Sequence, residues 1–482
     1  MKVIRRRALF HQRRTSNLYR LFVMTLLILG GTWLIIRLRT GEVRSPFEPT
    51  PTSTRTINSW LMEGDAFFNA GDLNSAISAY EDATRVDPNN AEALAKLARI
   101  QAYSSRLLSN DTDRLTRLSD ALQSADRAKA LAPEDTDILA IRAFVLDWNA
   151  DPNLDVLRSD GKTAAKMMIE ADQEALRAIS ANGQNPLALA FYAEILIDEQ
   201  KWTQAEQYIQ SALPLGQQVM DVHRVYGYYL ESIRYYNQAI EEYQKALTIT
   251  PNLTFLYISI GHNYRALANN SPPGYQQTVL YNQALDSYAR AVRLNTQLGI
   301  LDPSPYLAIA KTYVQQGQFF AAALNAQKAV SLDPKNADLY GQLGGFYKSG
   351  RNYETSLYAL QCAVDGCTPD ISCLARNGCP AGDAGVTVPA LPLTPRSAVY
   401  YLDYGSVLAA FSPQKPSYCT TAVRVLTQLI QTYKTDPIIV RNAADGLSIC
   451  ANVIAAQTST PTFSLTTVGT TATPVPYSTP TR

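Results

Sequence analysis

Residues 57–88 read INSWLMEGDAFFNAGDLNSAISAYEDATRVDP, and this stretch decides the fold. Apolar and small residues recur at helical spacing in two runs, with Gly71 between the runs and Pro88 after the second. The same order of residue types starts again at Ala91, 34 residues after Ile57. A repeat of this length predicts pairs of antiparallel helices that stack into a solenoid.

The pattern recurs through most of the chain. Its shared features are an aromatic residue in the first helix, a small residue where the helices touch, and alanines in the second helix, often with a tyrosine. Three repeats show them: Trp60, Gly64, Ala76, Tyr80 and Ala83; Tyr226, Gly227, Ala239, Tyr243 and Ala246; and Tyr340, Gly344, Tyr347 and Ala363. The pattern resembles the tetratricopeptide (TPR) family over roughly residues 57–456. This resemblance implies an all-α, right-handed α-solenoid of about nine helix pairs, closed by a capping helix over residues 437–456, and a binding surface rather than a catalyst.

The first helix of each pair is expected to start near Ile57, Ala91, Thr136, Pro186, Met220, Thr254, Pro303, Ala337 and Ala398. Three pairs exceed the period, with insertions between their two helices around residues 104–113, 151–161 and 270–274. We expect these loops to emerge on one edge of the solenoid. They either build an additional contact surface or reflect tolerated variation in loop length.

Charge divides the chain into two unequal parts. Residues 1–44 hold ten bases and one acid, whereas the remainder holds 33 bases and 41 acids, a net charge of −8. An acidic body argues against a nucleic-acid partner, which requires a concentrated basic face. The basic end therefore needs another explanation.

That explanation is a membrane anchor. Residues 21–36 contain no charge and lie between Arg20 and Arg37, so residues 18–38 are predicted to form a transmembrane helix with a basic cytoplasmic tail over residues 1–17. A cleaved signal peptide and a mitochondrial targeting segment are the alternatives. Residues 39–56 are a Pro/Thr-rich linker, and residues 457–482 a Thr/Pro-rich tail expected to be disordered.

All six cysteines lie in the last quarter of the chain. An even number in a segment expected outside the cytoplasm suggests disulfides. Cys419 is expected to bridge to Cys450 in the capping helix. Of the other four, Cys362 lies just before a Cys/Pro/Gly-rich insertion at about residues 366–396 and three lie within it. Here Cys362–Cys367 and Cys373–Cys379 are expected, with other pairings and a zinc site left open.

No catalytic, cofactor or metal residues are assigned. Histidine occurs only at His11, His223 and His262, and no nucleophile, phosphate-loop or zinc-hydrolase motif is present. We therefore expect a protein that is not an enzyme and uses no cofactor.

The resemblance places a peptide groove on the first helix of each pair. The early repeats offer Asp65, Phe68, Arg99, Phe144, Asp147, Glu194 and Ile197, and the later ones offer Arg224, Tyr228, Phe255, His262, Arg265, Lys311 and Lys348. The later set mixes cations with aromatic residues, which suits an extended peptide with acidic groups or a free carboxylate. A solvated charged face is the alternative.

Together these patterns favour a single-pass membrane protein with a cytoplasmic N-terminus and a solenoid at the cell surface or in the periplasm. It would bind proteins or peptides as a scaffold and assist assembly of an envelope or surface complex. Two alternatives remain: an accessory subunit of an envelope glycan or wall enzyme complex, and a mitochondrial outer-membrane TPR receptor.

Overall fold

The computed structural model describes residues 17–40, 55–379 and 382–458 of the 482-residue chain. It contains two compact units, divided after Thr56. The expected basic tail lies almost wholly outside the described residues, as do most of the Pro/Thr-rich linker and the Thr/Pro-rich tail.

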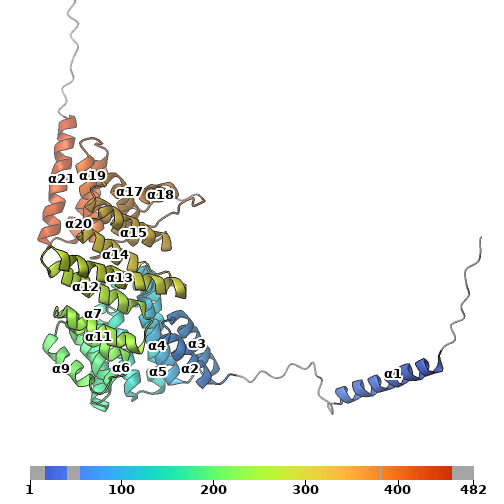
Figure 1. Ribbon diagram of the computed structural model, residues 1–482. Helices are drawn as coiled ribbons and strands as arrows, with labels where there is room; N and C mark the ends of the chain where they lie inside the picture. The colour runs from blue at the N-terminus through green and yellow to red at the C-terminus, as the bar shows by residue number, and fades with distance from the viewer. Residues whose placement is uncertain (1–16, 41–54, 380–381, 459–482) are drawn as a thin grey trace, which may run out of the picture. The chain divides into compact units, whose positions relative to one another are not determined.

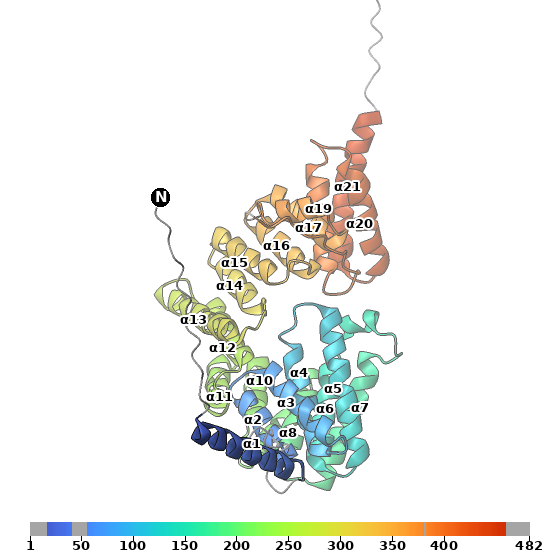
Figure 2. The ribbon, with the colours of Figure 1, turned by 90° about the vertical axis from the view of Figure 1, so that its right-hand side faces the viewer.

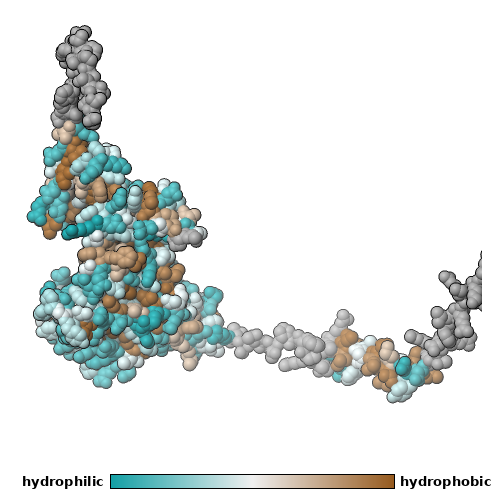
Figure 3. Space-filling view, turned by 45° about the horizontal axis from the view of Figure 1, so that its top comes forward, coloured by the Kyte–Doolittle hydropathy of each residue, from teal (hydrophilic) through white to brown (hydrophobic). Residues whose placement is uncertain are grey.

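The first unit contains one isolated helix, α1 (Leu18–Arg39), as predicted. Its apolar side chains are exposed along its length, which Figure 3 shows as a row of hydrophobic residues. Thr25 and Thr32 turn their hydroxyls back onto the helix and donate to the carbonyls of Leu21 (2.7 Å) and Ile28 (2.8 Å). Both polar side chains are therefore satisfied within the helix, as an apolar environment requires.

The second unit is all-α, and the predicted solenoid of nine helix pairs is confirmed. The pairs are α2 (Ile57–Asn69) with α3 (Leu73–Val86), α4 (Ala91–Ser105) with α5 (Asp111–Leu131), α6 (Thr136–Asn149) with α7 (Ala164–Ala181), α8 (Pro186–Asp198) with α9 (Trp202–Ala212), α10 (Met220–Ser232) with α11 (Tyr236–Ile249), α12 (Thr254–Asn270) with α13 (Tyr275–Leu298), α14 (Ser304–Gln315) with α15 (Phe319–Leu332), α16 (Ala337–Ser349) with α17 (Tyr353–Val364), and α19 (Ala398–Phe411) with α20 (Tyr418–Thr432). Only the seventh pair starts one residue later than expected, because Pro303 is the N-cap of α14.

Small residues allow the two helices of a pair to touch. A Cβ atom added at Gly64 would lie 2.5 Å from the ring of Tyr80, and one at Gly227 would lie 2.9 Å from the ring of Tyr243. Both distances are far inside van der Waals contact. The glycines are therefore packing positions, as the repeat pattern predicts.

Two lobes build the solenoid (Figures 1 and 2). In the first lobe, α2–α13, one large core contains the buried residues from Leu61 to Ile260 together with Ile300, and two small clusters around Tyr281 and Tyr288 bury α13 against α12 and α14. In the second lobe, α14 to the C-terminal helix, two smaller cores extend from Leu307 to Val388 and from Leu357 to Cys450. The lobes meet at the segment between α13 and α14, where Asp302 is buried.

The first lobe is coiled tightly enough to fill its own axis. Tyr103 of α4 is fully buried and stacks on Phe255 of α12, with ring centroids 5.5 Å apart, and it also packs against Phe144 and Trp148 of α6. Its hydroxyl donates to Asp221 of α10, a carboxylate that also pairs with Arg99. Contacts between the second, third, fifth and sixth repeats thus replace an open groove.

The residues of the three insertions form different structures. The first lengthens α5 to 21 residues and leaves a short loop, residues 106–110. The second contains the 3₁₀ helix η1 (Pro152–Leu157). The third lengthens α12 to 17 residues and α13 to 24 residues, so that only residues 271–274 form a loop.

The cysteine-rich insertion forms a small ordered element with the short helix α18 (Pro369–Ala375). The structure joins Cys362 to Cys367 and Cys373 to Cys379, the pairs that the sequence analysis names. Backbone hydrogen bonds between Cys367 and Val388 hold the returning strand-like segment against α17.

The C-terminal helix α21 (Pro437–Thr458) packs on α19 and α20 and is joined to α20 by the Cys419–Cys450 disulfide. Residues 18–37 and 437–457 are both long and apolar enough to cross a membrane. Helix α21 buries Ala443 and Cys450 against its neighbours, which is the behaviour of a cap on the solenoid.

Candidate binding cavity

A cavity of about 960 Å³ lies between the two lobes. Its walls come from helices α4, α5, α6, α8, α10, α11 and α12 of the first lobe and from α14, α16 and α19 of the second. Ligand sites generally occupy about 300–1,000 Å³ and often lie where two bodies meet. This cavity is therefore the principal candidate for a functional site in the described part of the chain.

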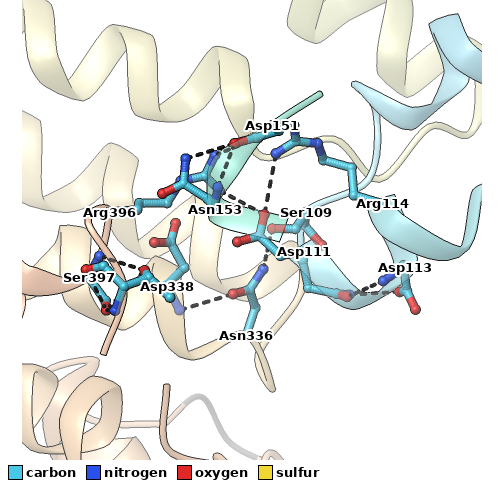
Figure 4. A network of polar contacts seen from close by, with 12 residues as sticks. Ser109, Asp111, Asp113, Arg114, Asp151, Asn153, Asn336, Asp338, Arg396 and Ser397 are labelled. Atoms are coloured by element: carbon cyan, nitrogen blue, oxygen red, sulfur yellow. Dashed lines mark hydrogen bonds and ion pairs between the residues drawn. The ribbon is translucent and has the colours of Figure 1, made fainter. Parts of the chain in front are cut away.

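A polar clasp joins the lobes along one side of the cavity (Figure 4). Asn336, before α16, donates to the carbonyl of Ser109 (2.6 Å) in the first inserted loop. Arg396, at the end of the cysteine-rich insertion, donates to Asp111 (2.8 Å). The clasp thus joins the insertions of the second and eighth repeats, which lie far apart in the sequence.

Arg114 extends the clasp on the first-lobe side. It donates to Asp151 (2.8 Å), which begins η1 and accepts the backbone N–H of Asn153 (2.9 Å). Two of the three insertions therefore build a contact surface between lobes, one of the two roles considered for them. The third, at residues 271–274, contributes no residue to the cavity wall.

Arg224 is a cation of the cavity wall that forms several hydrogen bonds. From α10 it donates to both carboxylate oxygens of Glu194 on α8 (2.7 and 2.6 Å) and to the hydroxyl of Tyr103 (3.1 Å). It is only 4% exposed and lies over the rings of Tyr103, Phe144 and Trp148. A buried bidentate pair of this kind is a structural element, so its charge is already neutralised.

Three carboxylates nearby have no such cation. Asp147 of α6, Asp198 of α8 and Glu231 of α10 line the cavity and form no ion pair within the described part of the chain. Asp198 accepts from Tyr228 (2.6 Å), and Glu231 accepts from Asn263 (2.8 Å). The first-lobe wall thus gathers three carboxyl groups that no cation of the described chain neutralises.

The pKa values of these three carboxyl groups are raised. Burial, followed by the negative charges of Asp198 and Glu194, raises the pKa of Asp147 well above its usual range. Loss of hydration between the cavity walls raises the pKa of Asp198 to about 6, although its side chain remains open to the cavity. Burial also raises the pKa of Glu231.

The part of the wall formed by α12 and α14 has fewer free charges. Burial and the positive charges of Arg265 and Lys311 lower the pKa of His262 to about 3, so this imidazole is neutral at physiological pH. The surrounding walls and Arg265 lower the pKa of Lys311, which stays exposed to the cavity and forms no ion pair in the described chain.

The structure brings together five of the seven residues proposed for the groove: Arg224, Tyr228, Phe255, His262 and Lys311 line the cavity. Arg265 donates instead to the carbonyl of Ala308 (3.2 Å), and Lys348 pairs with Asp403 away from the cavity. Few of these cations therefore remain free to bind an acidic peptide, as the sequence analysis predicted they would.

Sequence reasoning missed several cavity residues that lie outside the regular repeat positions: Arg106, Ser109, Asp111, Arg114, Asp151, Asp338 and Arg396. Most of them belong to insertions or to connections between helices. The interruption of the 34-residue period was the available signal, because an insertion next to a concave face can fold over it.

The comparisons with known proteins agree with this architecture. A family model described as "TPR repeat" matches residues 64–102, and a second model, described as "Tetratricopeptide repeat", matches residues 225–253 and 303–336. The chain is a solenoid of tetratricopeptide repeats. TPR solenoids use their extended concave surfaces to bind other proteins. No curated protein sequence matches the chain.

Several solved structures are similar to the chain at low identity, and the first of them, with a TM-score of 0.50, shows the same fold. A monomeric mutant of IFIT1 with m7Gppp-AAAA is 16% identical, with 83% of this chain and 82% of that chain covered and a TM-score of 0.50. A human IFIT1 dimer with PPP-AAAA is 15% identical, with 84% and 92% covered and a TM-score of 0.49. A thermophilic TPR protein from Thermus thermophilus is 17% identical, with 43% and 98% covered and a TM-score of 0.34.

Proposed function

We propose that the chain is a membrane-anchored TPR scaffold, not an enzyme, that holds peptide segments of partner proteins in the cavity between its two lobes. The observation that carries this proposal is the cavity itself, because the concave face of the first lobe is filled whereas the space between the lobes is open to a ligand. Helices from eight repeats reach that space, so a bound segment would contact both lobes at once.

Two features support a position outside the cytoplasm. Helix α1 exposes an apolar surface that water does not stabilise, and its length suits a membrane anchor with a cytoplasmic N-terminus. The three disulfides are typical of secreted or surface proteins. The same disulfides weigh against a mitochondrial outer-membrane receptor, whose solenoid would face a reducing compartment.

The proposed process is assembly of an envelope or surface complex. A long anchor-plus-solenoid chain concentrates its partners beside the membrane, where linked binding sites gain effective concentration. The ligand named with the IFIT1 mutant is not carried over. Its phosphates suit a positively charged site, whereas the unpaired ionisable side chains of this cavity are mainly carboxyl groups.

Topology and partners are testable together. Intact cells are treated with a membrane-impermeant maleimide before and after reduction, and the native membranes are then crosslinked and analysed by mass spectrometry. Labelling of the cysteines only after external reduction, with crosslinks from cavity residues to an envelope protein, is the expected result. Free thiols that only permeabilised cells expose would overturn the extracytoplasmic placement.

A further inference from the structure

The unpaired charges of the cavity do not balance. Arg114 and Arg396 are engaged by the clasp carboxylates, and Arg224 by Glu194. The ionisable side chains outside these ion pairs are four carboxyl groups against two bases: Asp147, Asp198, Glu231 and Asp338 against Arg106 and Lys311. The free space between the lobes therefore favours a positively charged occupant.

Asp147 is the most informative of these carboxylates. It is 4% exposed, lines the cavity, and has no hydrogen-bond partner on either carboxylate oxygen within the described chain. Burying an unpaired carboxylate is costly, and a cation with N–H donors beside it offsets part of that cost. An unsatisfied acid at a ligand-sized cavity thus indicates a missing donor.

The surroundings explain why no group of the chain supplies that donor. Asp198, Glu194 and Glu199 on α8 repel the Asp147 carboxylate, and the nearby Arg224 on α10 is already committed to Glu194. Burial and, after it, these negative neighbours raise the pKa of Asp147, and a bound cation would oppose the repulsion by the neighbours.

A cation already lies beside this wall. Arg106, in the loop after α4, holds its guanidinium over the ring of Trp148, 5.1 Å from the centroid, and forms no ion pair in the described chain. Trp148 in turn donates its indole N–H to Glu194 (3.2 Å). An aromatic face backed by carboxylates is a favourable environment for ammonium and guanidinium groups.

We infer that the Asp147–Asp198–Glu231 wall, with Trp148, binds a primary ammonium or guanidinium group, and that its source is a lysine or arginine side chain of a partner peptide. This assignment rests on the proposed function. An organic cation suits the wall better than a metal ion, because no group of three metal-ligating side chains is found among the described residues. The cavity volume accommodates several residues of an extended chain.

The test uses the full-length protein in detergent micelles and isothermal titration with four probes. These are a lysine pentapeptide, the same peptide with acetylated lysines, a glutamate pentapeptide, and spermidine as a free amine. We expect saturable binding of the lysine pentapeptide at one site, with affinity reduced about tenfold or more by acetylation, since charge-assisted hydrogen bonds are lost.

The decisive variant is Asp147→Asn combined with Asp198→Asn. It removes one buried and one crowded charge without changing shape, so the fold is retained, and thermal unfolding checks this. Its affinity for the lysine pentapeptide should fall about tenfold or more. The matched control, Glu81→Gln with Asp286→Asn, removes the same charge from exposed positions outside the cavity and should leave affinity within about twofold.

Removal of the internal cation provides an independent check. Arg106→Ala should strengthen binding of the lysine pentapeptide several-fold, because no side chain of the protein then competes for the wall. Weaker binding by this variant would contradict the assignment. If the cation binds beside Arg106, removal of the arginine charge reduces the repulsion between them and should strengthen binding.

The other outcomes separate the two proposals. Binding of the glutamate pentapeptide in place of the lysine peptide overturns the cation site and leaves peptide capture standing. Binding of no pentapeptide overturns both. Spermidine binding as tight as the lysine pentapeptide would overturn the peptide source, and equal losses in the cavity and control variants would overturn the location.

Discussion

The two lobes of the solenoid solve the same stability problem in different ways. The first lobe encloses one large core, and its axis is filled by aromatic rings around buried ion pairs. The second lobe divides its apolar residues between two smaller cores and contains all six cysteines, joined as three disulfides. The first lobe, with its large core, thus contains buried ion pairs, whereas the second lobe, with its small cores, contains the disulfides.

This difference also explains where the cavity lies. Coiling of the first lobe brings its early and middle repeats into contact, so its concave face becomes core. The second lobe does not continue that coil tightly, and the space between the lobes stays open, bordered by the clasp. A regular solenoid without the filled axis would have spread its binding surface over all repeats.

The largest expected effect is at the axis of the first lobe. Arg224→Ala should lower the free energy of unfolding by about 3–5 kcal/mol, because Glu194 is left buried and uncompensated. Urea unfolding followed by circular dichroism measures it. As a control, Lys348→Ala breaks a partly exposed pair with Asp403 and should cost about 1 kcal/mol or less. Equal effects would show that the axis is not what holds the lobe.

A slightly smaller effect is expected in the second lobe. Cys419→Ala with Cys450→Ala opens a link between residues 31 apart and should cost about 3–4 kcal/mol. Hydrogen exchange should increase in α19–α21, while α4–α10 stay protected. Removal of the Cys362–Cys367 pair, which closes a much shorter loop, should cost less. Loss of protection in both lobes would contradict their separate stabilisation.

The junction between the lobes should respond to pH. Burial raises the pKa of Asp302 to about 6, above the unfolded value of 3.8, so the folded state holds the proton more tightly. This group therefore lowers stability as pH rises from about 4 to above 6. Asp302→Asn should stabilise the protein by about 2–3 kcal/mol at pH 7.5 and by little at pH 4. Thermal unfolding across this range checks it, and a pH-independent difference would contradict the assignment.

The smallest effect on stability is expected at the clasp. Arg396→Ala removes an exposed pair with Asp111 and should cost about 1 kcal/mol or less. The separation of the lobes is a more sensitive readout. Spin labels on α5 and α16 should show a broader distance distribution in the variant. An unchanged distribution would mean that packing at the α13–α14 junction alone fixes the lobes.

The fold was predictable because the repeat pattern is local. Glycine at position 64 faces Tyr80 within one pair, and the starts of the helices follow from the 34-residue period. The spacing favoured the Cys362–Cys367 and Cys373–Cys379 pairs that the structure contains, while leaving other pairings and a zinc site open. Such features depend on neighbours along the chain, so a single sequence contains them.

The cavity was only partly predictable because it depends on contacts between distant repeats. Arg224 was placed on the concave face, but nothing in the sequence shows that Glu194, 30 residues earlier, neutralises it. The clasp joins residues separated by 227 and 285 positions. How tightly a solenoid coils is set by small rotations summed over many repeats, and the sequence pattern does not reveal that sum.

Site-specific photo-crosslinking in native membranes tests the central claim most directly, namely that partners are held in the cavity between the lobes. A photoreactive phenylalanine analogue replaces Tyr228, which lines the cavity, or Tyr275, which is 85% exposed at the start of α13. The account predicts crosslinks at position 228 to lysine- or arginine-containing segments of a partner, and their loss when the lysine pentapeptide is added. Crosslinks to the partner from position 275 alone, with none from position 228, would contradict it.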